Sequence, residues 1–258
     1  MRLNVSATLD YGIEAPADLL VQIEAAAMPD QSVIGAKFDP GQTAHLHRIA
    51  AEDGVGTRVW LHCDQRLICS YNAEIRIDRS DPDLSTLSQD PVHQLPHEAV
   101  RYLMASRFCP SDEFQSFTDS QFGHLSGGAF VDAVARWIET RFTYAPGASQ
   151  ATTTAIDTFV SRRGICRDYA HVMISLARAA AIPARMVSCY APRVTPQDFH
   201  AVVQVWLDGD WRIVDPTGMA SASETAIIGV GRDAADIAFL TSYGWVTLKD
   251  QRITVSQA

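Results

Sequence analysis

The 258-residue sequence lacks several features that would each point to a particular class of protein. It has no cluster of lysine and arginine residues, and its formal net charge is −9. A nucleic-acid-binding face or an attraction to anionic lipid needs such a cluster. No apolar run approaches the roughly 20 residues that a transmembrane helix requires. We therefore expect no nucleic-acid partner and no membrane partner.

The sequence also lacks the signs of secretion and of a metal site. Residues 1–24 have no long apolar core of the kind found in a signal peptide. An odd number of cysteines without such a segment is typical of reduced thiols, and no two of them have the Cys-x2-Cys spacing of a structural zinc site. We therefore expect a cytoplasmic protein without a metal or cofactor. The five cysteines are Cys63, Cys69, Cys109, Cys166 and Cys189.

The first 80 residues have the period of β-strands. Apolar side chains alternate with polar ones near the N-terminus and again in residues 66–77, as in strands with one buried face. Residues 57–63 come just before the second strand, so the two are expected to pair across a tight turn. Residues 81–96 contain three prolines and no periodicity, which indicates a linker. The sequence predicts a β-rich domain at 1–80, a linker at 81–96 and a second domain at 97–258.

The second domain begins with helical periodicity and returns to strands after residue 200. Helices are predicted within 97–108, 128–142, 152–163 (with Gly164 as the C-terminal cap) and from Cys166 to about residue 180. Strands follow at 200–207 and 210–215, and two short strands are expected near the C-terminus. This order of strands, helices and strands favours the α+β class over a doubly wound sheet.

Cys166 falls at the start of a predicted helix, directly after Gly-Ile. Backbone N–H groups there have no intrahelical partner, and the positive end of the helix dipole favours a thiolate. The position suits a nucleophile, although a small buried cysteine would also fit it. A nucleophile needs a base within reach. His171 is the nearest histidine in the sequence, but it lies about 140° around the helix from Cys166 and therefore faces a different neighbour.

His200 has the better context for a base. The segment VVQVWL-DG-DWRIVD is typical of a hairpin, because Asp-Gly favours a two-residue turn. With that turn, Asp215 lies opposite Val202, so His200 and Asp215 share one face as diagonal neighbours. An acid in that position can orient the imidazole. A three-residue loop would move Asp215 to the other face.

The segments around Cys166, His200 and Asp215 together resemble the transglutaminase-like superfamily, including its bacterial members described as candidate cysteine proteases. The resemblance rests on Gly-x-Cys at a helix start, Ile-Pro-Ala-Arg at residues 182–185, the His-Ala strand, and Trp-x-x-x-Asp-Pro-Thr at residues 211–217. It implies a papain-like core behind an N-terminal β-rich domain. It also implies that Cys166 is the nucleophile, His200 the general base and acid, and Asp215 the orienting acid.

The chemistry that the resemblance implies is acyl transfer through a thioester on Cys166. The expected substrate is a peptide or protein that offers a glutamine or another amide, and the acceptor is water or an amine. The alternatives are a non-catalytic peptide-binding or scaffold module that keeps the fold, and acyl transfer to a small arylamine, which fits the flanking motifs less well.

Five further residues have open roles. Val202 and Gln204 stand where many members have Trp and Glu, which bears on the substrate more than on the chemistry. Cys189 is expected to be a packing residue rather than a redox partner of Cys166. Arg232 and Asp233 form either an ion pair that supports the site or a surface turn.

Overall fold

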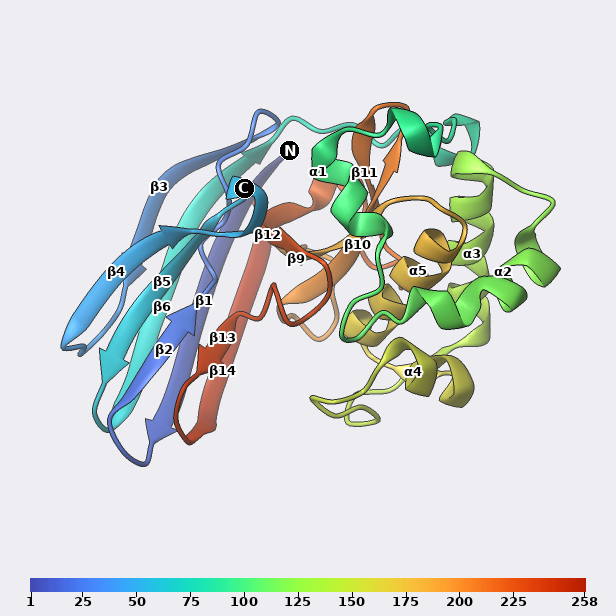
Figure 1. Cartoon of the computed structure of the whole chain (residues 1–258). Helices are drawn as coiled ribbons and strands as arrows, with labels where there is room; N and C mark the ends of the chain where they lie inside the picture. Colours follow the sequence, from blue (N-terminus) through green and yellow to red (C-terminus); the bar gives the residue numbers. More distant parts are fainter.

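The computed structural model describes residues 1–258 and has two parts that lie side by side (Figure 1). One part is a sandwich of two four-stranded sheets. The other is a four-stranded sheet covered by helices. Each part has its own cluster of buried apolar side chains. No helix has the length and apolarity needed to cross a bilayer.

The sandwich forms because its strands alternate in burial. In β1, every second side chain from Leu3 to Ile13 is buried, and β5 and β6 follow the same pattern. One sheet has the order β14 (Val246–Gln257), β1 (Arg2–Ile13), β6 (Arg66–Ile77) and β3 (Gln31–Asp39). The other has the order β13 (Leu240–Ser242), β2 (Ala17–Val21), β5 (Thr57–Cys63) and β4 (His45–Ala50).

The predicted hairpin between β5 and β6 is wrong. β5 pairs with β2 and β4, whereas β6 pairs with β1 and β3. At Asp64–Gln65 the chain passes from one sheet to the other, so the apolar faces of β5 and β6 meet in one core. Alternation looks the same for a hairpin and for this crossing, because both give strands with one buried face.

The predicted boundary of the second domain also differs from the structure at its C-terminal end. β13 pairs with β2, and β14 pairs with β1 from Leu3 to Ile13. The last strand of the chain thus completes the sandwich and brings the two termini together, with the Ala258 N–H donating to the Arg2 carbonyl at 3.1 Å. Figure 1 shows both chain ends at the same end of the sandwich.

The second part is built around α5 (Cys166–Ala179), which lies against a sheet with three fully buried strands. The sheet has the order β11 (Asp210–Val214), β10 (His200–Leu207), β9 (Ala184–Tyr190) and β12 (Ala226–Gly231). The remaining helices are α1 (His97–Val100), α2 (Gln115–Phe122), α3 (Gly127–Arg141) and α4 (Ala155–Ser161). A two-stranded parallel ribbon joins β7 (Thr143–Tyr144) to β8 (Arg163–Gly164).

Two helix ends differ from the predictions. The helix predicted at 97–108 ends at Val100 and continues only as a 3₁₀ turn over Arg101–Leu103. The left-handed residue that ends α4 is Arg162, with φ 56°, and not Gly164. Its guanidinium lies over the rings of Trp137 and Phe159, at 4.4 and 4.2 Å from their centroids, and such stacking holds the residue in place.

Candidate active site

Cys166 is the first residue of α5, as predicted, and the start of this helix is fixed by Asp168. The buried Asp168 carboxylate accepts a hydrogen bond from the Ile165 N–H at 2.8 Å. It also forms an ion pair with Arg167 at 3.0 Å. Gly164 permits this approach, because a Cβ there would lie 2.7 Å from the Asp168 Cβ. The first N–H groups of a helix lack intrahelical partners, and the positive end of the helix dipole favours negative charge at this position.

His200 and Asp215 are brought together by the predicted hairpin. Asp208 and Gly209 have φ values of 48° and 69°, which a two-residue turn of this kind requires, and Leu207 pairs with Asp210. The His200 Nε2 and the Asp215 Oδ2 are 2.8 Å apart, and both side chains are buried. The register predicted from the Asp-Gly turn is therefore confirmed, and His200 and Asp215 are in contact.

The Asp215 carboxylate is held by several donors besides His200. Its oxygens accept hydrogen bonds from the N–H and hydroxyl of Thr217 at 2.9 and 2.7 Å, and from the N–H groups of Met219 and Ala220 at 3.1 and 2.8 Å. These bonds fix the carboxylate beside the ring and satisfy its charge in a buried position. Asp215 is thus held in a fixed position beside the His200 ring.

The pKa of the His200 imidazole is raised, which favours its protonated form. Burial lowers its pKa, but the hydrogen bond with Asp215 and the interaction with the Cys166 thiol outweigh burial and raise the pKa to about 10. Nε2 faces Asp215, so Nδ1 is the ring nitrogen available to Cys166, and in this structure Nδ1 is buried without a hydrogen-bond partner. An imidazolium next to a thiol favours the thiolate.

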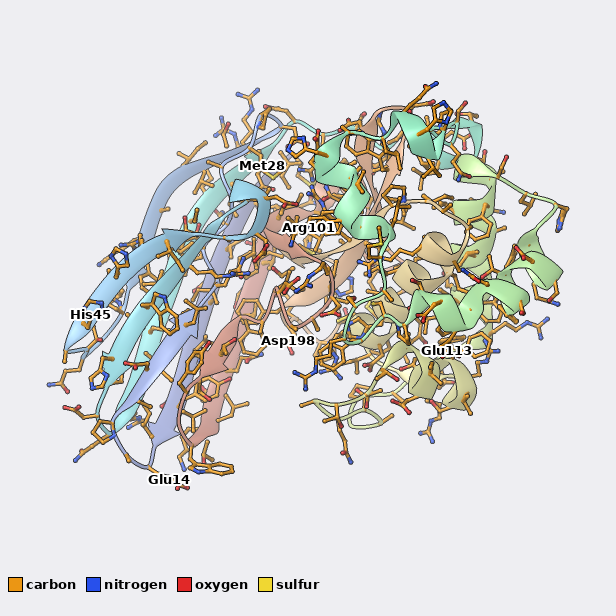
Figure 2. All side chains as sticks on the ribbon, in the orientation of Figure 1. Glu14, Met28, His45, Arg101, Glu113 and Asp198 are labelled. Carbon is orange, nitrogen blue, oxygen red and sulfur yellow. The ribbon has the colours of Figure 1, made fainter.

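Cys166 and His200 line the same cavity, which has a volume of about 410 Å³. Its walls are mostly apolar and come from the ends of β7 and β8, the segment before β10, and the segment after β12. Asp198 lies where the two parts of the molecule meet (Figure 2), and it is the single acid of the lining. Besides Cys166 and His200, the lining residues include Tyr144, Val194, Phe199, Ala234, Ile237 and Phe239.

Tyr144 is a cavity residue that no sequence motif indicates. The β7–β8 ribbon pairs Tyr144 with Gly164, and its ring packs against that of Tyr169, with centroids 5.9 Å apart. Burial is the largest cause that raises the pKa of the phenol, and the Cys166 thiol raises it further, whereas the hydrogen bond with the Cys166 backbone lowers it. A two-residue parallel ribbon has no periodicity, so no sequence signal reveals this placement.

Cys189, Arg232 and Asp233 lie near the cavity wall or the sheet, and their contacts differ in part from the expectations. Cys189 is buried, pairs across the sheet with His200 and forms no disulfide. Arg232 forms its ion pair with Asp236 at 2.9 Å and not with Asp233, so the expected Arg232–Asp233 ion pair is wrong, and Arg232 lies exposed on a bend. Asp233 is instead buried and accepts a backbone hydrogen bond from Phe108 at 2.9 Å.

Residues 117–216, which hold all three predicted site residues, match the Transglutaminase-like superfamily. The chain has a transglutaminase-like core. A crystal structure of a candidate cysteine protease from Cytophaga hutchinsonii is similar over 100% of this chain and 90% of that one, with 27% identity and a TM-score of 0.92. The predicted α+β class with a papain-like, transglutaminase-like core is therefore confirmed, and the similarity to the Cytophaga structure extends over the sandwich as well.

Two curated relatives match part of this chain. An uncharacterized protein of Mycobacterium leprae is 34% identical over 117 residues, which are 42% of this chain and 42% of the relative. An uncharacterized protein of Mycobacterium tuberculosis is 29% identical over 134 residues, or 46% of this chain and 43% of the relative. The matched segment thus spans less than half the length of these relatives.

Proposed function

We propose that this transglutaminase-like protein is a cysteine-dependent enzyme that transfers the acyl group of an amide substrate. The observation that carries the proposal is the shared cavity: Cys166 lies at a helix start, and His200, held by Asp215 at 2.8 Å, lines the same 410 Å³ space. A nucleophile, a base and a group that orients the base are the parts that covalent acyl transfer requires.

The proposed first half-reaction forms a thioester. The Cys166 thiol gives its proton to His200 Nδ1, and the sulfur attacks the carbonyl carbon of the amide. The negative charge on the carbonyl oxygen is stabilised by N–H groups of the first turn of α5. When the C–N bond breaks, His200 returns the proton to the leaving nitrogen, which departs as an amine or as ammonia.

The second half-reaction releases the acyl group. His200 takes a proton from water or from a primary amine, which attacks the thioester carbon. The C–S bond then breaks, and the proton returns to the Cys166 sulfur. Water gives a carboxylic acid, and an amine gives a new amide. The expected substrate is a peptide or protein with a glutamine or other amide group, and hydrolysis is the favoured outcome.

The proposal is tested by the labelling rate of Cys166 with iodoacetamide, measured by mass spectrometry in the wild type and in His200→Gln. Cys166 is 8% exposed and the other thiols are less exposed, so faster labelling than those thiols could reflect access alone. His200→Gln keeps a side chain in place but removes the base, so Cys166 labelling near neutral pH should fall about tenfold or more. Equal rates in the two proteins would contradict an activated thiol.

The reaction itself is tested with a peptide library, with and without an added primary amine, on the wild type and on Cys166→Ala. Cleaved or deamidated products indicate hydrolysis, and amine adducts indicate transamidation. Cys166→Ser and Cys189→Ala serve as matched controls, because the second removes a buried thiol outside the cavity lining. If the wild type binds peptides but turns none over, the alternative of a non-catalytic peptide-binding module replaces the proposal.

A further inference from the structure

The segment after β12 forms one wall of the cavity that holds Cys166, and it is tied to the helix that carries Cys166. Ala234, Ile237, Ala238 and Phe239 line the cavity. Ile237 packs into the core of the helical part, whereas Phe239 packs against the core of the sandwich. The wall therefore spans both parts of the molecule, and its position decides the width of the space beside the thiol.

His171 and Arg178 of α5 hold the start of this wall. The Ala234 N–H donates to His171 Nε2 at 3.2 Å, and the Arg178 guanidinium donates to the Arg232 carbonyl at 2.6 Å. The two side chains are seven residues apart, so they project from nearly the same face of the helix. Both are buried, with exposed fractions of 0% and 4%.

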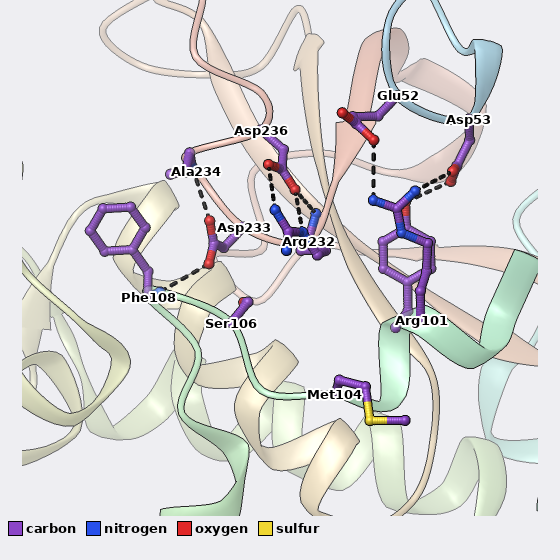
Figure 3. A network of polar contacts seen from close by, with 12 residues as sticks. Glu52, Asp53, Arg101, Met104, Ser106, Phe108, Arg232, Asp233, Ala234 and Asp236 are labelled. Carbon is purple, nitrogen blue, oxygen red and sulfur yellow. Dashed lines mark hydrogen bonds and ion pairs between the residues drawn. The ribbon is translucent and has the colours of Figure 1, made fainter.

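Asp233 anchors the same turn from the other side. Its carboxylate accepts from the Phe108 N–H at 2.9 Å and from the Ala235 N–H at 3.0 Å, and the Phe108 ring stacks on His171 with centroids 5.2 Å apart. Figure 3 shows Asp233 between Phe108 and the start of the wall, with Arg232 turned away towards Asp236. We name His171, Arg178 and Asp233 the clasp.

The clasp has no direct part in the proposed chemistry. His171 lies five residues along α5 from Cys166 and is absent from the cavity lining, and Asp233 is absent from it too. His171 must accept a hydrogen bond at Nε2, so it has to be neutral. Burial, which is the largest effect, lowers its pKa to about 4.

We propose that the clasp residues His171 and Asp233 are positioning residues that set the apolar wall beside Cys166, and thereby determine how well the cavity holds a bulky apolar group next to the reacting amide. The inference rests on the proposed function. The rings of Phe199 and Phe239, stacked with centroids 4.7 Å apart, provide the apolar surface. A group bound against Phe239 keeps its place only while the segment leading to Phe239 is held.

The test compares two reagents that alkylate Cys166. Iodoacetamide is small and makes little use of the wall, whereas a chloromethyl ketone with a phenylalanine side chain binds in the cavity before it reacts. For the ketone, saturation kinetics give a binding constant KI and a rate kinact. The variants are His171→Leu, His171→Gln, Asp233→Ala and Asp233→Asn, with the exposed Arg252→Ala as the control.

His171→Leu and Asp233→Ala remove the acceptors and should raise KI for the ketone about tenfold, while kinact and the iodoacetamide rate stay within about twofold. His171→Gln and Asp233→Asn retain an acceptor oxygen and should recover most of the binding. Unchanged KI in folded variants, or an equal loss of all three quantities, would overturn the proposal.

A fallback variant and a separate readout of the proposed function keep the test of the wall interpretable. If the buried variants fail to fold, Arg232→Ala removes the half-exposed ion pair with Asp236 at the base of the same segment, and it should raise KI about threefold. An unchanged KI in that variant would then count against the proposal that the position of this segment sets the apolar wall. Failure of the proposed function is read separately, from wild-type iodoacetamide labelling that does not exceed that of His200→Gln.

Discussion

His200 and His171 are both buried, both lie in the helical part, and both have an aspartate nearby, yet they are held in opposite states. The pKa of His200 is raised to about 10, and that of His171 is lowered to about 4. The difference lies in what each ring contacts. His200 Nε2 meets a carboxylate oxygen of Asp215, whereas His171 Nε2 meets a backbone N–H.

Asp233 shows why a nearby acid is not sufficient to charge a histidine. Its two carboxylate oxygens are directed to backbone N–H groups of Phe108 and Ala235, so it raises the pKa of His171 only through its charge at a distance. Burial then dominates and keeps the ring neutral. A charged imidazole suits proton transfer at a thiol, and a neutral one suits the support of a backbone turn.

The largest expected effect comes from removing the charge of Asp215. Asp215→Asn keeps an amide beside His200 Nε2 but loses the carboxylate that stabilises the imidazolium, so amide turnover should fall about 100- to 10,000-fold. The kcat/KM profile against pH measures this loss, and NMR titration should show the His200 pKa falling from about 10. Asp233→Asn, the matched change beside His171, should leave kcat within about twofold. Equal losses of kcat in the two variants would remove the functional distinction between the histidines.

The next effect is a pH dependence of stability with opposite signs for the two rings. His171 has a folded pKa of about 4, below its unfolded value near 6.5, so the unfolded chain binds the extra proton between these values. Stability should therefore fall as pH drops from about 6.5 to 4, by about 2–3 kcal/mol from this group. For His200 the folded pKa is raised, so its contribution is complete below pH 6.5 and is lost as pH rises towards 10.

Urea unfolding across this pH range checks both signs. His171→Gln should flatten the acid side of the stability profile and leave the alkaline side as in the wild type. His200→Gln should do the reverse. An acid side that is equally steep in His171→Gln would show that other groups cause it, and the buried neutral state of His171 would then have no energetic consequence.

The comparison also explains what the sequence could predict. Cys166 at a helix start and the contact of His200 with Asp215 follow from local rules: a glycine, a helical period, and an Asp-Gly turn that sets the register. The partners of His171 come from residues 108 and 233–234, which lie far away in the sequence and carry no periodic signal. The two-residue ribbon that places Tyr144 is beyond such rules for the same reason.

The errors in the sandwich have a related cause. Strand alternation predicts that a segment has one buried face, but it does not say which strand lies beside it. The alternation therefore predicts a hairpin of β5 and β6, although they lie in different sheets. It also places the strands after residue 240 in the domain nearest in sequence, whereas they belong to the sandwich. Packing between distant segments decides both points.

The smallest effect concerns the bonds that hold Asp215. Thr217→Val has nearly the same shape but removes the hydroxyl that donates to Asp215 at 2.7 Å, while the Thr217 N–H remains. The loss of one such bond is worth about 1 kcal/mol, so kcat should fall about three- to tenfold and KM should change little. His200, with a less well fixed acid, should titrate at a changed pKa, whereas the His171 signal should not move. A shift of His171 instead would mean that the two histidines are coupled through β10 and α5, and the contrast between a proton-transfer ring and a supporting ring would no longer hold.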